Sequence, residues 1–388
     1  MKWLWNSLAV ALALSVSLVA CAPKVAPAPL TATPQATAAP VAQPPAGPQV
    51  SPEEVAWQQT VNAAKREGRL VVYETGSYFT GDSGRAVAAT FKDRYGITVE
   101  FLVTGGSSTT IEKLKVEKRM GQAVADIDTA GGSSSRSMVD LGIMKDISRE
   151  LPALKDKSPF IMDPVYSPGG EALSFTYTRL APGVNTNQVK VGEIQSHADL
   201  LDPKWKGKIT MRDPRLGSGA EPLSVTTYRY LKILDDDYFR RLADQKPALL
   251  SIAAIEVAQM VARGEYAIMW GGAVDSYYAP IIAQGGPLAV APMKEGTVAQ
   301  ASVVLTLADS SHLNAARVFS NWLLSAEGQA TFHKAKSAPS FRKDVPDFSP
   351  RQIASVKFDK IIPFTWEIAE VARAEVTSGV MEKLFGKR

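Results

Sequence analysis

Short apolar runs that alternate with helical stretches are the feature that most limits what this chain can fold into. The first run, Leu70–Tyr73, is too brief for a helix and rich in β-branched residues, and it follows a helix predicted to begin after Ser51 and to end at Gly68. Further strands are predicted at Ile97–Val103 and Val124–Ile127, separated by helices that close at glycines. A second set of predicted strands is Ala172–Thr178, Lys208–Met211 and Tyr266–Trp270. This alternation predicts parallel βαβ units and therefore an α/β fold.

Glycine and serine follow the predicted strands where the chain turns into the next helix. In an open α/β sheet, ligands bind outside the carboxyl ends of the strands, where helix N-termini present unpaired N–H groups. Glycine lets the backbone approach a ligand, and serine adds a hydroxyl that donates or accepts. The residues predicted to contact a ligand are Gly76, Ser77, Tyr78, Gly106, Ser107, Ser108, Ser133, Ser134, Arg215, Ser218 and Tyr277. Each loop alone is equally typical of ordinary caps and turns, and only the recurrence favours a binding site.

The length of the chain predicts two lobes, because roughly 340 residues past the leader exceed what one compact core usually holds. We expect two doubly wound α/β lobes, joined by a hinge, whose facing polar loops close over one solute. Tyr166 and the Ser167–Gly170 segment are predicted to lie near one crossover. The predicted divisions are 1–20 (signal peptide), 21–50 (disordered Pro/Ala-rich tether), 51–167 (first part of lobe 1), 168–290 (lobe 2) and 291–388 (return to lobe 1, and C-terminal helices).

Cys21 is the only cysteine, and it follows an apolar run of about signal-peptide length. The preceding Leu18-Val19-Ala20 resembles the lipobox of bacterial lipoproteins, which predicts an exported protein anchored to a membrane through a lipidated Cys21. An ordinary signal peptide with a chance cysteine is the alternative. The Pro-rich composition of residues 22–49 cannot bury a core and predicts an extended tether.

Several classes of function are disfavoured by composition. The net charge of +4 is spread along the chain without a basic stripe, so nucleic acid is not an expected partner. The histidines, His197, His312 and His333, lack zinc-ligand spacing, and no G-x-S-x-G nucleophile elbow is present. His312 and His333 are expected to have surface roles near helix ends. We therefore expect no catalytic residue, no resident metal ion and no cofactor.

Motifs spread over most of the chain resemble one known family. They are Ala63–Tyr73, Pro203–Ile209, Val261–Tyr266, Asn314–Ala316 and Trp322–Gln329. In this order they resemble the type 2 periplasmic-binding-protein family, the extracellular solute-binding components of ABC importers. The most similar branch is the one labelled iron(III)-binding. The resemblance implies two α/β lobes joined by hinge strands, which close over one solute and present it to a permease.

The ligand residues of that branch are only partly present. Its ferric members place a histidine and a glutamate after the first and third strands, and a Tyr-Tyr pair shortly after the strand corresponding to Tyr266–Trp270. This chain has Ser77 and Tyr78 in the first loop and Ser133 in the third, and its Tyr277–Tyr278 pair comes later, inside a predicted helix. Fe(III) prefers anionic oxygens, which Tyr78 and Tyr277 could supply as phenolates. The serine-rich loops fit a carboxylate, phosphate-like or sugar-phosphate anion at least as well, and helix packing is the other interpretation of the Tyr-Tyr pair.

The sequence thus predicts a substrate-binding lipoprotein without enzymatic activity. It would capture a small polar or anionic solute, or ferric iron, and deliver it as a monomer to an ABC permease and its ATPase. The alternatives are an exported hydrolase on a similar fold and a ligand sensor that signals to a membrane partner.

Overall fold

A computed structural model describes residues 51–216 and 219–387. These residues belong to one compact unit. The predicted signal peptide (1–20), the predicted tether (21–50), the lipidation residue Cys21 and the predicted ligand residue Ser218 lie outside the described residues.

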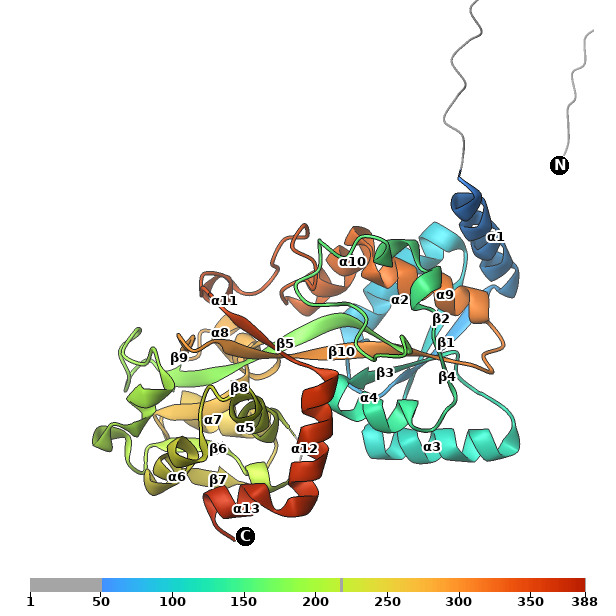
Figure 1. The fold of residues 1–388 in the computed structure, drawn as a ribbon. Coiled ribbons are helices and arrows are strands. Elements are labelled where there is room, and N and C mark those ends of the chain that lie inside the picture. Colours follow the sequence, from blue (N-terminus) through green and yellow to red (C-terminus); the bar gives the residue numbers. More distant parts are fainter. Residues whose placement is uncertain (1–50, 217–218, 388) are drawn as a thin grey trace, which may run out of the picture. The chain divides into compact units, whose positions relative to one another are not determined.

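A mixed sheet of 11 strands organises the described residues, in the order β2-β1-β3-β10-β5-β8-β6-β7 (Figure 1). The strands are β1 (Arg69–Glu74), β2 (Thr98–Val103), β3 (Ile127–Gly131), β5 (Ala172–Asn185), β6 (Ile209–Arg212), β7 (Ala248–Leu250), β8 (Ile268–Ala273) and β10 (Thr297–Leu307). The short strands β4 (Met144–Lys145) and β11 (Ile361–Phe364) pair with β10, and β9 (Leu288–Val290) pairs with β5. Strand β1 is parallel to β2 and β3, and β6 is parallel to β7 and β8, as the alternation predicts.

Two long antiparallel strands connect these parallel groups. Strand β5 pairs with β10 along residues 172–180 and with β8 along residues 180–184. Strand β10 pairs with β3 along residues 302–306 and with β11 along residues 297–300. The Ser167–Gly170 segment forms a turn directly before β5, where the Gly170 amide donates to the Ser167 carbonyl (3.0 Å). The segment expected near a crossover therefore leads into the first connecting strand.

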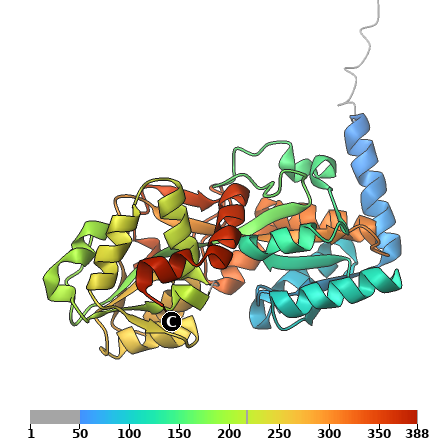
Figure 2. The ribbon, with the colours of Figure 1, turned by 60° about the horizontal axis from the view of Figure 1, so that its bottom comes forward.

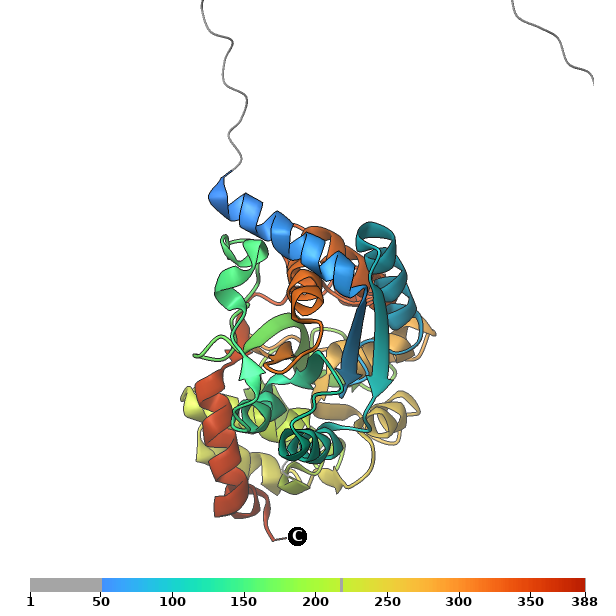
Figure 3. The same cartoon turned by 90° about the vertical axis from the view of Figure 1, so that its right-hand side faces the viewer.

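Helices follow most strands and begin and end at residues that the sequence singles out. Ser51 caps α1 by accepting from the Glu54 amide (3.1 Å), and Gly68, with φ of 69°, ends it. The helices of the first part are α1 (Pro52–Glu67), α2 (Gly81–Tyr95), α3 (Ser107–Met120), α4 (Gly132–Val139), α9 (Leu313–Leu324) and α10 (Ala326–Lys336). The others are α5 (Ala220–Tyr230), α6 (Asp236–Asp244), α7 (Ala254–Ala262), α8 (Ala279–Ala283), α11 (Arg351–Ala354), α12 (Trp366–Ser378) and α13 (Val380–Phe385). Helix α1 lies beside α9 (Figure 3).

Separate hydrophobic cores divide the described residues into two groups. The buried core residues of the first group come from 61–177 and 299–341, and we call this group lobe 1. Those of the second come from 180–298 and 353–385, and we call it lobe 2. Helices α12 and α13 contribute to the lobe 2 core, and Figure 2 shows them together against its helices. That the lobes move as domains bounded at 51–167, 168–290 and 291–388 stays a prediction.

Some element boundaries differ from those predicted. The third strand begins at Ile127 and not at Val124, which is 53% exposed and precedes the pairing with β1. The strand predicted to end at Thr178 continues to Asn185, because its second half pairs with β8. These differences arise from pairing between distant segments, which local periodicity does not report.

Candidate functional site

The loop after β1 folds around a buried carboxylate. Glu74, the last residue of β1, accepts hydrogen bonds from the amides of Gly76 (2.9 Å) and Phe79. Ser77 is exposed and adopts a left-handed backbone conformation (φ 59°), and its carbonyl accepts from the Lys336 ammonium (3.2 Å). The Gly76 amide is therefore bonded within the protein, and the Ser77 side chain faces solvent.

Tyr78 points from this loop toward the start of α4. Its ring packs edge-on against Phe175, with 5.5 Å between the ring centroids. A Cβ built on Gly131 would lie 3.8 Å from the Tyr78 hydroxyl and 3.9 Å from the Ser134 hydroxyl, so these groups surround one glycine. Burial raises the pKa of Tyr78 to about 12, although a hydrogen bond with Ser302 acts in the opposite direction. Tyr78 is therefore a neutral hydroxyl at physiological pH.

Helix α3 begins over a cluster of threonines. Gly106 precedes the helix with φ of 109°, and no side chain caps its first amides. Ser107 is half-buried and Ser108 is exposed. Beneath them, the Thr110 hydroxyl lies 2.8 Å from that of Thr75, which donates to Asp128 (2.8 Å). Burial raises the pKa of Asp128 to about 8, and its other oxygen has no hydrogen-bond partner.

Helix α4 also begins without a side-chain cap. The Ser134 hydroxyl donates to the Gly131 carbonyl (3.0 Å), while Ser133 is exposed and accepts from the amide group of Gln300 (3.2 Å). Gln300 and Ser302 belong to β10, which brings them to this edge from far along the chain. The β10 residues were not predicted, because their strand arrives from outside the local βαβ pattern.

The predicted residue Arg215 has other partners in the structure. Its guanidinium donates to both oxygens of Asp213 (2.8 and 2.9 Å) and to the carbonyls of Gly386 (3.1 Å) and Lys387 (3.0 Å). These bonds attach the C-terminal segment to the loop after β6. The structure does not bring Arg215 together with the lobe 1 residues, and Ser218 is not described.

The lobe 2 strand exits bring together three residues, of which only Tyr277 was predicted. Arg212 ends β6, Glu221 is the second residue of α5, and Tyr277 lies in the π-helix Val274–Tyr278 that follows β8. Glu221 has no solvent exposure, neither carboxylate oxygen has a hydrogen-bond partner, and burial raises its pKa to about 7. A predicted helical position for Tyr277 is confirmed.

The two tyrosines from opposite lobes lie within electrostatic reach of each other. The pKa of Tyr277 is raised by burial and then by the charge of Glu221, and lowered by that of Arg212. The charge of Tyr277 in turn contributes to the raised pKa of Tyr78. The Tyr78 loop of lobe 1 and the Tyr277 helix of lobe 2 therefore lie near enough for their charges to interact. Tyr278 instead is buried and donates to the Ala181 carbonyl (3.2 Å), which is a packing role.

The histidines do not form a metal centre. Within the described residues, no group of three or more His, Cys, Asp or Glu side chains could hold a metal ion. His197 is buried and its Nδ1 lies 3.2 Å from Glu295, whereas His312 is the N-cap residue directly before α9 and contacts Asp126. The expected surface role of His333 is wrong. Its ring is fully buried against Phe332, and burial lowers its pKa to about 3.

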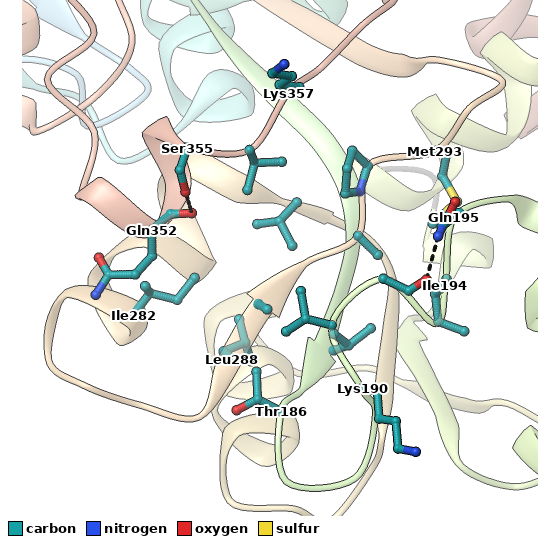
Figure 4. Close-up of a pocket in the computed structure, with 18 of the residues that line it drawn as sticks. Thr186, Lys190, Ile194, Gln195, Ile282, Leu288, Met293, Gln352, Ser355 and Lys357 are labelled. Carbon is teal, nitrogen blue, oxygen red and sulfur yellow. Dashed lines mark hydrogen bonds between the residues drawn. The ribbon is translucent and has the colours of Figure 1, made fainter.

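Two cavities lie away from the strand-exit residues described above. The larger, of about 730 Å³, lies in lobe 2 beside β9 and α11, and Figure 4 shows Lys190 and Lys357 on opposite sides of it. The other, of about 570 Å³, is lined by Tyr166, Trp366 and residues of β11. None of the predicted ligand residues that are described lines either cavity. In the part of the chain that is described, no helix has the length and apolar character needed to cross a bilayer.

The two groups of parallel strands, joined by β5 and β10 and carrying glycine-rich exits, define a type 2 periplasmic-binding-protein fold. A family model described as bacterial extracellular solute-binding protein matches residues 86–360. The chain belongs to this family and is a periplasmic solute-binding protein of the ABC-transporter type.

Individual relatives agree with this assignment. An uncharacterised protein of Haemophilus influenzae is 27% identical over 275 residues, which cover 69% of this chain and 76% of the relative. AfuA from Actinobacillus pleuropneumoniae, solved with fructose-6-phosphate bound, is 26% identical with a TM-score of 0.60, over 82% of this chain and 97% of that one. Iron-bound HitA from Pseudomonas aeruginosa is 20% identical with a TM-score of 0.63, over 82% and 99%. The HitA comparison shows the fold alone.

Proposed function

We propose that this protein captures a small anionic solute at the strand exits of the two lobes and delivers it to the permease and ATPase of an ABC importer. One observation carries the proposal: helices α3, α4 and α5 all begin at these exits, and none has a side-chain cap at its N-terminus. Ser51, Asp235 and Ser325 cap α1, α6 and α10, whereas α2 and α9 also lack a side-chain cap, so it is the common location of α3, α4 and α5 at the strand exits that distinguishes them. Uncapped N-terminal amides favour an anion.

Neutral donors around these amides support an anion over a bare cation. Ser107 and Ser133 present neutral hydroxyls at the lobe 1 exits, and the cationic side chain of Arg212 lies at the lobe 2 exit. AfuA, which shares 26% of its residues with this chain, was solved with a sugar phosphate. We therefore favour a phosphate- or carboxylate-bearing solute.

Ferric iron is the second candidate, because Tyr78 and Tyr277 approach each other from opposite lobes. Iron would require phenolates. The raised pKa of Tyr78 opposes this in the absence of metal. The histidine and glutamate implied by the ferric relatives are also replaced at the first and third strand exits.

Calorimetry on four variants separates these candidates. Loss of one donor to a buried charged group costs on the order of 1.5–3 kcal/mol, or roughly ten- to a hundredfold in affinity. Ser107→Ala and Ser133→Ala should each weaken binding of fructose 6-phosphate or another anion by about that factor, whereas Tyr78→Phe and Tyr277→Phe should change little. Ser378→Ala, at the exposed last residue of α12, is the matched control. A coloured ferric complex that disappears only in the tyrosine variants would establish iron instead.

We also propose that Cys21 carries a lipid anchor and that the protein is exported. The lipobox-like Leu18-Val19-Ala20 and the family's extracellular location support this. Cys21→Ser should then release the protein into the soluble fraction or block its processing. Unchanged processing and membrane attachment of the variant would rule out the anchor.

A further inference from the structure

Glu221 is the most unusual charged group of the candidate site. It lies in the first turn of α5, between the exits of β6 and β8, and is completely buried. Within residues 51–216 and 219–387, it is the one carboxylate with both oxygens buried and without a hydrogen-bond partner. A buried acceptor in this state is costly unless a donor reaches it.

Two other buried acids show the usual arrangement, whereas Asp128 keeps one oxygen bonded to Thr75 and one without a partner. Glu74 accepts from two backbone amides, and Asp275 accepts from the backbone amide and the guanidinium of Arg179. Both are fully supplied with donors by the protein itself. No side chain of the described residues donates to the two oxygens of Glu221, which leaves this carboxyl available to a donor on a ligand.

The carboxyl of Glu221 and the guanidinium of Arg212 both pack closely against Gly219. A Cβ built on Gly219 would lie 2.7 Å from Nη1 of Arg212 and 3.2 Å from Oε2 of Glu221. Gly219 has φ of 105°, and neighbouring Gly271, at the β8 exit, has φ of 73°. Only glycine fits at position 219, because a side chain there would collide with Arg212, and this close packing holds the guanidinium and the carboxyl near each other.

We propose that Glu221 accepts a hydrogen bond from a hydroxyl group of the captured solute, so that the solute is a hydroxylated anion and not a bare oxyanion. This inference rests on the proposed function. A hydroxyl donates to the carboxylate and accepts from the adjacent Arg212, which suits a pair of one acceptor and one donor. An ammonium group fits less well, because the Arg212 charge repels it.

The anionic part of the solute then belongs at lobe 1, where α3 and α4 begin. Because Glu221 has no solvent exposure in this structure, the hydroxyl reaches it when the lobes separate, and closure buries the new bond. Burial raises the pKa of Glu221, and nearby backbone groups and the Arg212 charge lower it only in part.

The test compares fructose 6-phosphate with inorganic phosphate by calorimetry on the full-length protein. Glu221→Gln should weaken fructose 6-phosphate about tenfold, because a bond to a charged acceptor becomes a bond to a neutral one, and leave inorganic phosphate within about twofold. Glu221→Leu, which removes the acceptor, should weaken the sugar phosphate by about a hundredfold. Glu256→Gln, the same change in the first turn of α7 at an exposed position, is the control.

Equal losses for both probes, or no loss for either, would overturn the role of Glu221. Thermal melts of each variant establish whether an equal loss comes from misfolding, and the Glu221 variant that melts like wild type then decides the outcome. Wild-type protein that binds inorganic phosphate but not fructose 6-phosphate or glycerol 3-phosphate would refute the hydroxylated solute and leave the proposed function standing. If the wild type binds none of the anions, the proposed function fails as well.

Discussion

Glu221 should make the stability of the ligand-free protein depend on pH in a way that one substitution removes. Burial raises its pKa from 4.5 to about 7, so the folded state holds this proton more tightly than the unfolded state does. The contribution of this group to stability is therefore complete below pH 4.5 and is lost as the pH rises through 7. Glu221→Gln keeps the shape of the side chain and removes its titration.

The magnitude follows from the difference in pKa. A shift from 4.5 to about 7 corresponds to about 3 kcal/mol at pH 8, and to less than about 1 kcal/mol at pH 5. Glu221→Gln should therefore gain about 2.5 kcal/mol more stability over wild type at pH 8 than at pH 5. Any effect of the substitution on stability that does not depend on pH, such as the cost of burying the glutamine amide, cancels when the two pH values are compared.

Urea unfolding followed by tryptophan fluorescence at pH 5 and pH 8, without ligand, measures this difference. The Glu256→Gln variant should track wild type at both pH values, since its side chain is exposed. If Glu221→Gln and wild type differ by the same free energy at pH 5 and pH 8, the carboxyl is not desolvated as described, and the reasoning is refuted.

Three further predictions concern other parts of the chain. The pKa of His333 is lowered from 6.5 to about 3, so this residue should destabilise the protein as the pH falls below 6.5, by about 3 kcal/mol at pH 4. His333→Met should remove this acid sensitivity, which urea titrations from pH 8 to pH 4 would measure. Arg179→Met should cost about 3–5 kcal/mol of unfolding free energy, because it leaves Asp275 buried without its cation; a loss below about 1 kcal/mol would contradict the buried pair. Small-angle scattering should show a smaller radius of gyration when a binding solute saturates the protein, and an unchanged radius with verified binding would exclude closure.

Much of the fold was accessible from the sequence. The helix over Pro52–Glu67, with its Ser51 cap and its glycine end, and the parallel strands β1 and β2 follow from local periodicity and capping chemistry. The glycine and serine loops were correctly placed at strand exits for the same reason. These features depend on residues within a few positions of each other.

Which residues form the candidate site was harder to predict from the sequence. Tyr78 and Ser134 meet around Gly131, but Gln300 and Ser302 join them only because β10 returns beside β3. Ser107, Ser108 and Ser133 are placed at the exits, yet the sequence did not reveal which of them keep a free hydroxyl. Arg215 illustrates the limit: it was predicted to contact an anion, whereas the structure pairs it with Asp213 and the C-terminal segment.

The sequence by itself determined the α/β class, the order of the strands along the chain and the chemistry of the exit loops, because these depend on short-range patterns. Only the tertiary structure decided that Glu221 lies buried beside Arg212 without a hydrogen-bond partner, and that His333 is enclosed and not exposed. Burial and donor supply depend on which distant segments pack together. The polarity of a residue type does not encode that packing.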